Sequence, residues 1–168
     1  MAIAWRSAVF GAVGVLMLYG FAGAAGGGGG DDGRRAEPQD PAMAAAVQAI
    51  DAKEYARAIP MLEEVVTRLP GNAEAYNWLA YATRKNGDPA RSIPIYQKAL
   101  AIDPKHLGAH EYIGEAYLAL DDLPHAKQHL ARLNRLCFFS CEEYRDLKKA
   151  VEAYEKSAGK VKPAASRN

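Results

Sequence analysis

One repeat period, about 34 residues long, runs through the middle of this 168-residue chain and restricts what it can fold into. The period separates Pro70 from Pro104, and it also relates the pair Ile59-Pro60 to Ile93-Pro94. The same spacing relates two further columns, with small residues at Ala58, Ser92 and Ala126 and large ones at Leu62, Tyr96 and Leu130. Such a period is typical of stacked supersecondary units, each of which buries its apolar face only against its neighbours.

The order of these columns resembles the tetratricopeptide repeat (TPR), whose pattern is Trp-x2-Leu-Gly-x2-Tyr, then Ala-x3-Phe, then Pro. The middle unit carries it at Tyr76, Leu79, Ala80, Thr83, Ser92, Tyr96 and Pro104. The next unit carries it at His110, Ile113, Gly114, Tyr117, Ala126 and Leu130, with Phe138 in place of the closing proline. The first unit is weaker, because its opening helix is rich in alanine.

The resemblance implies an all-α fold of three TPR helical hairpins, stacked as a short right-handed solenoid, plus a C-terminal capping helix. The end of a solenoid exposes an apolar face that must be covered. Tyr144, Leu147, Val151 and Tyr154 fall at helical spacing and suit that role. We expect a TPR domain over residues 40–157, with repeats at about 39–72, 73–106 and 107–138 and the capping helix at about 141–156.

The N-terminus is predicted to be an export signal. No charge occurs from Ser7 to Gly30, and Ala22-Gly23-Ala24 offers small residues to a signal peptidase. We therefore expect a signal peptide over residues 1–25 and an exported, periplasmic protein of a bacterium. The alternative is an inner-membrane anchor formed by residues 7–25, with the domain facing the periplasm. Disordered segments are expected at 26–39, a glycine-rich linker, and at 158–168, a tail.

Composition excludes several classes of function. There are 21 Lys and Arg residues against 20 Asp and Glu residues, so no basic excess favours nucleic acid or an anionic membrane surface. The sequence has no recognisable catalytic triad, and its glycine run lacks the context of a phosphate loop. We expect a monomer that binds a protein or peptide, with no enzyme activity, cofactor or membrane contact beyond an uncleaved leader.

Cys137 and Cys141 form the one unusual motif. In an exported chain, two cysteines favour a structural disulfide, here at the joint between the third hairpin and the capping helix. The alternatives are a redox-active thiol pair, Cu(I) binding by two thiolates, or separate free thiols. The stretch from Leu136 to Leu147 also resembles the end of small exported bacterial TPR proteins with a Cys-x3-Cys-Glu-Glu-Tyr segment.

The four histidines form two pairs with i, i+4 spacing, His106 with His110 and His125 with His129. This spacing can chelate a metal ion. However, Leu107 and Ala126 stand where a zinc protease has glutamate, and His110 falls in a packing column of the repeat. We expect packing and solvent exposure, and no metal site.

The resemblance also implies a binding surface. TPR proteins bind peptide on the concave face, which the first helix of each hairpin lines. The matching positions here are Met43, Val47, Ile50, Asn77, Tyr81, Arg84, Lys85, Glu111, Glu115 and Leu118. The co-chaperone subgroup grips a C-terminal carboxylate with Lys, Asn and Arg residues, at places that here hold Met43, Val47, Trp78, Gly108 and Tyr112. Chaperone-tail binding is therefore not expected.

Overall fold

The computed structural model describes residues 40–161, and it confirms the all-α prediction. Within those residues there is no strand. Seven helices follow one another: α1 (Pro41–Asp51), α2 (Tyr55–Arg68), α3 (Ala73–Lys85), α4 (Pro89–Ile102), α5 (Leu107–Ala119), α6 (Leu123–Leu136) and α7 (Glu142–Val161). The expected signal peptide, the linker and residues 162–168 of the expected tail lie outside the described residues. Helix α7 extends past its expected end at 156, into the first residues of that tail.

The helix starts repeat with the sequence period. Asn72 and His106, one period apart, cap α3 and α5 by accepting a hydrogen bond from a backbone N–H. Asp88 and Asp122, separated by the same period, cap α4 and α6 in the same way. Asp40 caps α1. Each cap of this kind stabilises a helix by about 1 kcal/mol, so recurrence of the cap fixes where these helices begin.

Small residues bring the two helices of each hairpin close together. Ala58, Ser92 and Ala126, one from each hairpin, are fully buried. Large side chains then fill the space beside them, with Leu62 and Tyr96 also at 0% exposure. Fully burying a side chain of this size contributes roughly 1.5–3 kcal/mol. The repeated columns of the sequence are therefore the contacts that hold each hairpin together.

The capping helix α7 is seated against α5 and α6. Leu147 and Val151 are buried in a cluster with Leu133 of α6. Gly114 of α5 makes room for Leu147, since a Cβ atom on Gly114 would lie 2.6 Å from Leu147 Cδ2. Helix α7 thus covers the apolar end of the third hairpin, as expected for a solenoid cap.

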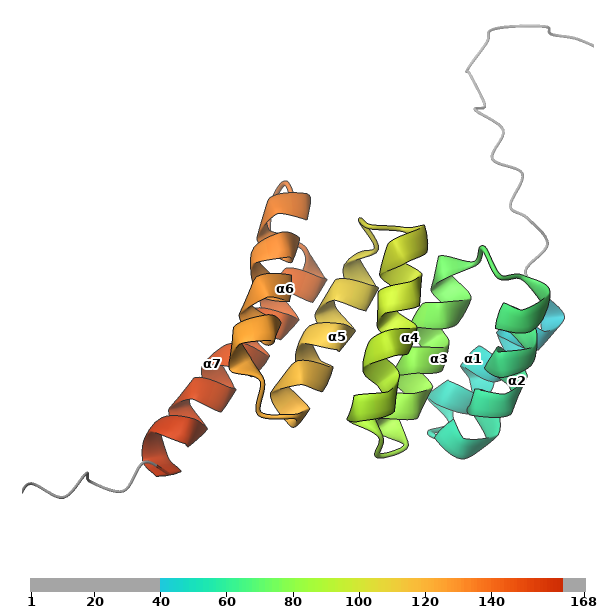
Figure 1. Cartoon of the computed structure of the whole chain (residues 1–168), viewed down its shortest axis with the longest axis horizontal. Coiled ribbons are helices and arrows are strands. Elements are labelled where there is room, and N and C mark those ends of the chain that lie inside the picture. The colour runs from blue at the N-terminus through green and yellow to red at the C-terminus, as the bar shows by residue number, and fades with distance from the viewer. Residues whose placement is uncertain (1–39, 162–168) are drawn as a thin grey trace, which may run out of the picture. The chain divides into compact units, whose positions relative to one another are not determined.

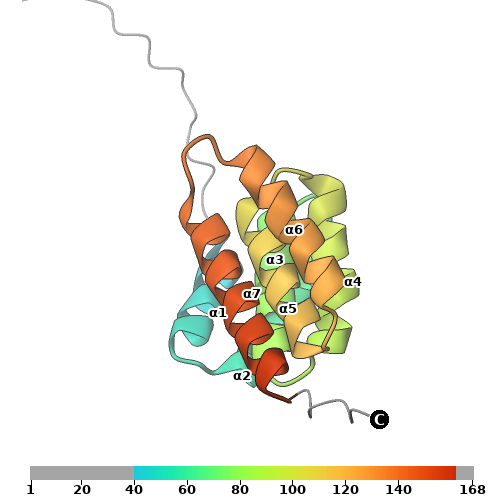
Figure 2. The same cartoon turned by 90° about the vertical axis from the view of Figure 1, so that its left-hand side faces the viewer.

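The hairpins follow one another in chain order in Figure 1, with α7 at the end of the row. In Figure 2, α4 and α6 lie on the right, α1 and α7 on the left, and α3 and α5 between them. The first helices of the hairpins therefore face the side on which α7 lies. No helix within residues 40–161 has both the length and the apolar character needed to cross a membrane.

Candidate functional site

All ten predicted groove residues lie on the first helices of the hairpins, α1, α3 and α5. The structure brings the α3 and α5 members together. Of the α1 members, Ile50 is buried in the first core cluster, and Met43 packs against that cluster together with Tyr81 of α3. Leu118 packs instead against the apolar cluster below α7. The groove residues that can meet a ligand as a group are therefore those of α3 and α5.

Tyr81 is the centre of an aromatic array on this side of the domain. Its ring centroid lies 6.4 Å from that of Tyr55, 5.6 Å from Trp78 and 4.9 Å from Tyr112. The rings come from α2, α3 and α5, so one surface of rigid aromatic side chains joins all three hairpins. Trp78 and Tyr112 occupy the same position in successive repeats, and this recurrence of an aromatic column is the signal that could have added them to the predicted groove.

Arg84 packs inside the aromatic array. Its Nη2 donates to Glu115 Oε2 at 2.7 Å, and only 13% of its side chain is exposed. Its guanidinium carbon lies 5.4 Å from the Tyr81 ring centroid and 5.7 Å from that of Tyr112, within the range of cation–π attraction. Lys85 is exposed, with its Nζ 5.8 Å from the Tyr81 ring. Lys85 is thus the freely presented cation of this surface.

An acidic cavity of about 240 Å³ lies beside this array, between α5 and α7. Its lining residues are Gly108, Glu111, Tyr112, Glu142, Glu143 and Asp146. The three carboxylates from the start of α7 were absent from the predicted site, because the sequence pattern assigned α7 only a covering role.

Glu111 is the buried member of the cavity, at 8% exposure. Burial raises its pKa to about 8, and the negative charges of Glu115, Asp146 and Glu143 add to the effect. Burial likewise raises the pKa of Tyr112 to about 12. Among the described residues Glu111 has no hydrogen-bond or ion-pair partner, since the neighbouring Arg84 is bound to Glu115. In the free protein the Glu111 carboxyl therefore keeps its proton to a higher pH than an ordinary glutamate does.

Two further polar groups on this side have unmet hydrogen-bonding capacity. Asn77 Oδ1 and Arg84 Nε are buried and have no hydrogen-bond partner among the described residues. Asn77 is 3% exposed and lies next to Gly108 at the rim of the acidic cavity. Because buried polar groups in folded proteins are nearly always paired, these two groups on α3, together with the unpaired side chain of Glu111 on α5, indicate a surface adapted to something other than stability.

The histidines do not bond to one another within the two i, i+4 pairs of the sequence. His106 Nε2 lies 2.7 Å from Glu74 Oε2, and this bond raises the His106 pKa. His110 Nε2 donates to the carbonyl oxygen of Pro104 at 3.1 Å, and His110 Nδ1 therefore accepts from His129 Nδ1 at 2.9 Å. Burial lowers the pKa of His129 to about 4. Within residues 40–161, no three His, Cys, Asp or Glu side chains are grouped to hold a metal ion.

Cys137 and Cys141 form a disulfide, with their Cα atoms 5.5 Å apart. It joins the end of α6 to the start of α7, as the structural interpretation predicted. In this state neither sulfur is a free thiolate, so Cu(I) binding would require reduction first. The disulfide-closed loop also presents Phe138 and Phe139 at 92% and 87% exposure.

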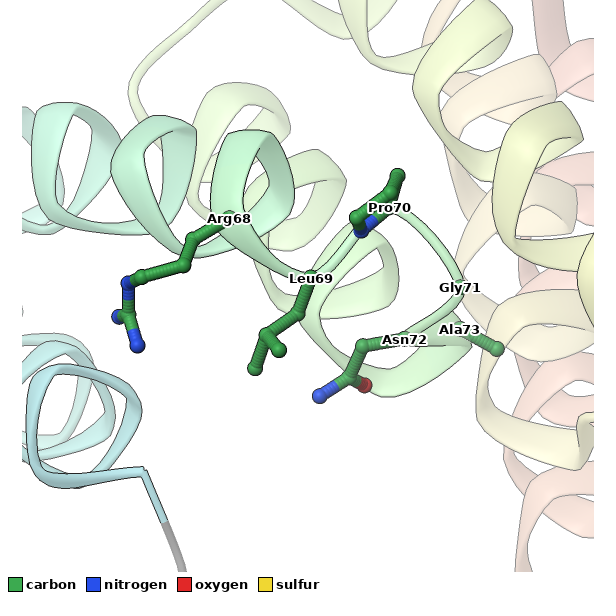
Figure 3. Close-up of a pocket in the computed structure, with 6 residues that line it drawn as sticks. All are labelled: Arg68, Leu69, Pro70, Gly71, Asn72 and Ala73. Atoms are coloured by element: carbon green, nitrogen blue, oxygen red, sulfur yellow. The ribbon is translucent and has the colours of Figure 1, made fainter.

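A separate hollow of about 540 Å³ lies over the turn between α2 and α3 (Figure 3). Its walls are the consecutive residues 68–73. Their polar groups are already engaged, since Arg68 binds Asp40 and Asn72 Oδ1 accepts from Ala75 N at 3.0 Å. In Figure 3 the Arg68 side chain points away from the turn, toward the start of α1. This hollow is a feature of the turn.

Comparison with known proteins identifies the repeat. Two family models, both described as tetratricopeptide repeat, match residues 43–106 and 83–151, which together make up more than half of the chain. The chain belongs to the tetratricopeptide repeat family. The matched residues include all three TPR hairpins and the first half of the capping helix.

Relatives and solved structures agree with this assignment. Cellulose synthase operon protein C of Escherichia coli is 36% identical over 69 residues, which are 41% of this chain and 6% of that protein. The chain spans less than a tenth of the length of the curated relatives it matches. MamA 41-end from Desulfovibrio magneticus RS-1 is 27% identical, with a TM-score of 0.56 over 61% of this chain and 58% of that one. The TPR2B domain of yeast Sti1, in a complex with pHsp70, shares the fold at 18% identity, with a TM-score of 0.64 over 69% and 94% of the two chains.

Proposed function

We propose that this protein is a non-enzymatic scaffold of the bacterial cell envelope that holds an extended segment of a partner protein on the inner side of its TPR domain. We assign the contact surface to α3, α5 and the start of α7. The observation that carries the proposal is that Asn77 Oδ1 and Arg84 Nε are buried there without a hydrogen-bond partner among the described residues, beside the buried and unpaired side chain of Glu111. A bound segment would supply the missing hydrogen bonds.

The aromatic array supports the same surface. Tyrosine and tryptophan dominate binding energy at protein interfaces, because they bury much area at little cost in entropy. Tyr81 and Tyr112 are partly exposed and in contact with one another, so they form a firm platform for a partner. A TPR domain of the same fold, from yeast Sti1, is in a complex with pHsp70, which supports protein binding as the class of function.

The envelope location is supported by the expected signal peptide over residues 1–25. A cysteine pair that forms a disulfide suits an oxidising compartment. The Escherichia coli relative, named for a cellulose synthase operon, is compatible with the same location. Sequencing of the mature N-terminus tests the location, with a start near Ala25 expected and an intact Met1 contradicting cleavage.

Site-specific crosslinking tests the groove. Two lysines are matched, since Lys85 on α3 and Lys98 on α4 each lie 5.8 Å from a tyrosine ring centroid. A photocrosslinking residue in the full chain at position 85 should trap a partner, which mass spectrometry identifies. The same residue at position 98, on the second helix of the hairpin, should not.

A substitution then checks the trapped complex. Tyr81→Ala should abolish the crosslink at position 85 while the circular dichroism spectrum stays unchanged. Equal trapping at positions 85 and 98, or full trapping in the Tyr81→Ala variant, would show that partners bind elsewhere.

A further inference from the structure

We propose that the cavity between α5 and α7 receives one basic side chain, lysine or arginine, of the bound partner segment. This inference rests on the proposed function and adds the chemistry of the partner to it. The cavity is lined by Glu111, Glu142, Glu143 and Asp146. No basic side chain among residues 40–161 lines it.

The carboxylates are available for a ligand. Arg84, the cation adjacent to Glu111, is bound to Glu115 at 2.7 Å. Glu111 is more than nine-tenths buried, forms part of the cavity wall and has no partner among the described residues. A buried carboxylate without a cation is costly, whereas the same carboxylate bonded to an ammonium or guanidinium group is strongly favoured. The cavity is therefore complementary to an incoming cation.

The shape of the wall selects a side chain over a metal ion. No three acidic, histidine or cysteine side chains in residues 40–161 are placed closely enough to coordinate an ion. Tyr112 forms one wall, and an aromatic face attracts lysine and arginine. Gly108 also lines the cavity, next to Asn77. An aliphatic stem can then cross the rim and place its charged end among the carboxylates.

Occupation changes the protonation of the site. The groups that face Glu111 are Glu115 on its own helix, Glu143 and Asp146 on α7, and Arg84 on α3. An added cation offsets the repulsion among these carboxylates. The added cation therefore lowers the pKa of Glu111 and favours release of its proton. Because burial and the neighbouring acids raise the Glu111 pKa to about 8, affinity for a basic segment should rise with pH up to about that value.

Peptide selection on the full chain provides the test. Peptides are selected from a random dodecapeptide library, and those whose binding is lost with Tyr81→Ala are kept as groove ligands. We expect them to share one lysine or arginine. Replacing it by norleucine or citrulline should weaken the Kd about tenfold or more, in line with loss of a charge-assisted hydrogen bond. This change leaves the protein untouched, so it does not depend on a variant that folds.

Protein variants give a second measurement. Glu143→Gln with Asp146→Asn should remove the preference for the basic residue. Glu152→Gln with Glu155→Gln, the same change in charge on the far side of α7, should keep it. Failure of the basic-residue site can be distinguished from failure of the proposed groove. Groove peptides that bind equally well with norleucine overturn the basic-residue site and leave the proposed function standing. If no selected peptide depends on Tyr81, the proposed groove itself is wrong.

Discussion

Replacement of Glu111 by glutamine should stabilise the free protein, and by an amount that depends on pH. Glutamine keeps the size and polarity of the side chain but cannot ionise. Burial and neighbouring acids raise the pKa of Glu111 from 4.5 to about 8. The folded state therefore holds more protons than the unfolded state between those values. By linkage, the free energy of unfolding falls as pH rises through that window.

The magnitude follows from the shift. Each pKa unit is worth about 1.4 kcal/mol. At pH 7, which lies above the ordinary glutamate pKa of 4.5 but below the folded-state pKa of about 8, this linkage lowers the free energy of unfolding of the parent protein by roughly 3 kcal/mol. At pH 5 it costs less than about 1 kcal/mol. We expect Glu111→Gln to gain most of this difference, with the gain growing from pH 5 to pH 8.

Urea denaturation followed by circular dichroism at pH 5, 6, 7 and 8 measures both proteins. Glu152→Gln on the exposed side of α7 is the matched control and should change stability by less than about 0.5 kcal/mol at every pH. A gain for Glu111→Gln that is equal at pH 5 and pH 8, or a loss at pH 7, would refute the reasoning. An equal gain would mean that folding does not shift the Glu111 pKa, and a loss would mean that Glu111 is ionised and paired in the folded protein.

Three further changes have expected outcomes that the same denaturation assay can check. His129 has a folded-state pKa of about 4, below its unfolded value, so its contribution to the free energy of unfolding is full above pH 6.5 and is lost as the pH falls toward 4. Over this range the His129→Gln variant should lose roughly 2–3 kcal/mol less stability than the parent. Gly114→Ala should cost about 1–3 kcal/mol by overpacking, and Leu147→Ala in the same chain should relieve it, whereas additive effects would contradict the close contact. Cys137→Ser with Cys141→Ser should fold but lose about 1–2 kcal/mol, and an unchanged stability would show that the disulfide does not constrain the joint.

The fold was predictable because one period governs it. Recurrence at this period fixes both the buried columns, such as Ser92 with Ala126, and the helix caps, such as Asp88 with Asp122. These contacts are local to a hairpin or to its neighbour, so spacing along the chain determines them. The length of α7 was less predictable, because a capping helix ends where its own interactions stop and no repeat column marks its end.

The site was predictable only in part. Family position indicated that α3 and α5 face the candidate groove, but it did not indicate which charges remain free. Arg84 was predicted as a groove position beside Lys85, and in the structure it is bound to Glu115 and largely buried. The His110–His129 hydrogen bond joins α5 to α6 and not residues four apart. Such pairings depend on how neighbouring helices pack, and one sequence does not contain that information.

The capping helix connects stability and function in this chain. A cap needs only an apolar stripe, which Leu147 and Val151 provide. The start of α7 instead adds Glu143 and Asp146 to a wall that already contains Glu111, and their repulsion helps to keep that carboxyl protonated. A glutamine at position 111 would remove this cost at no loss of fold. Because local rules of stability are broken mainly at functional sites, an unpaired buried acid supports the proposed ligand site, and a cation from the partner is the ligand that would turn the repulsion into attraction.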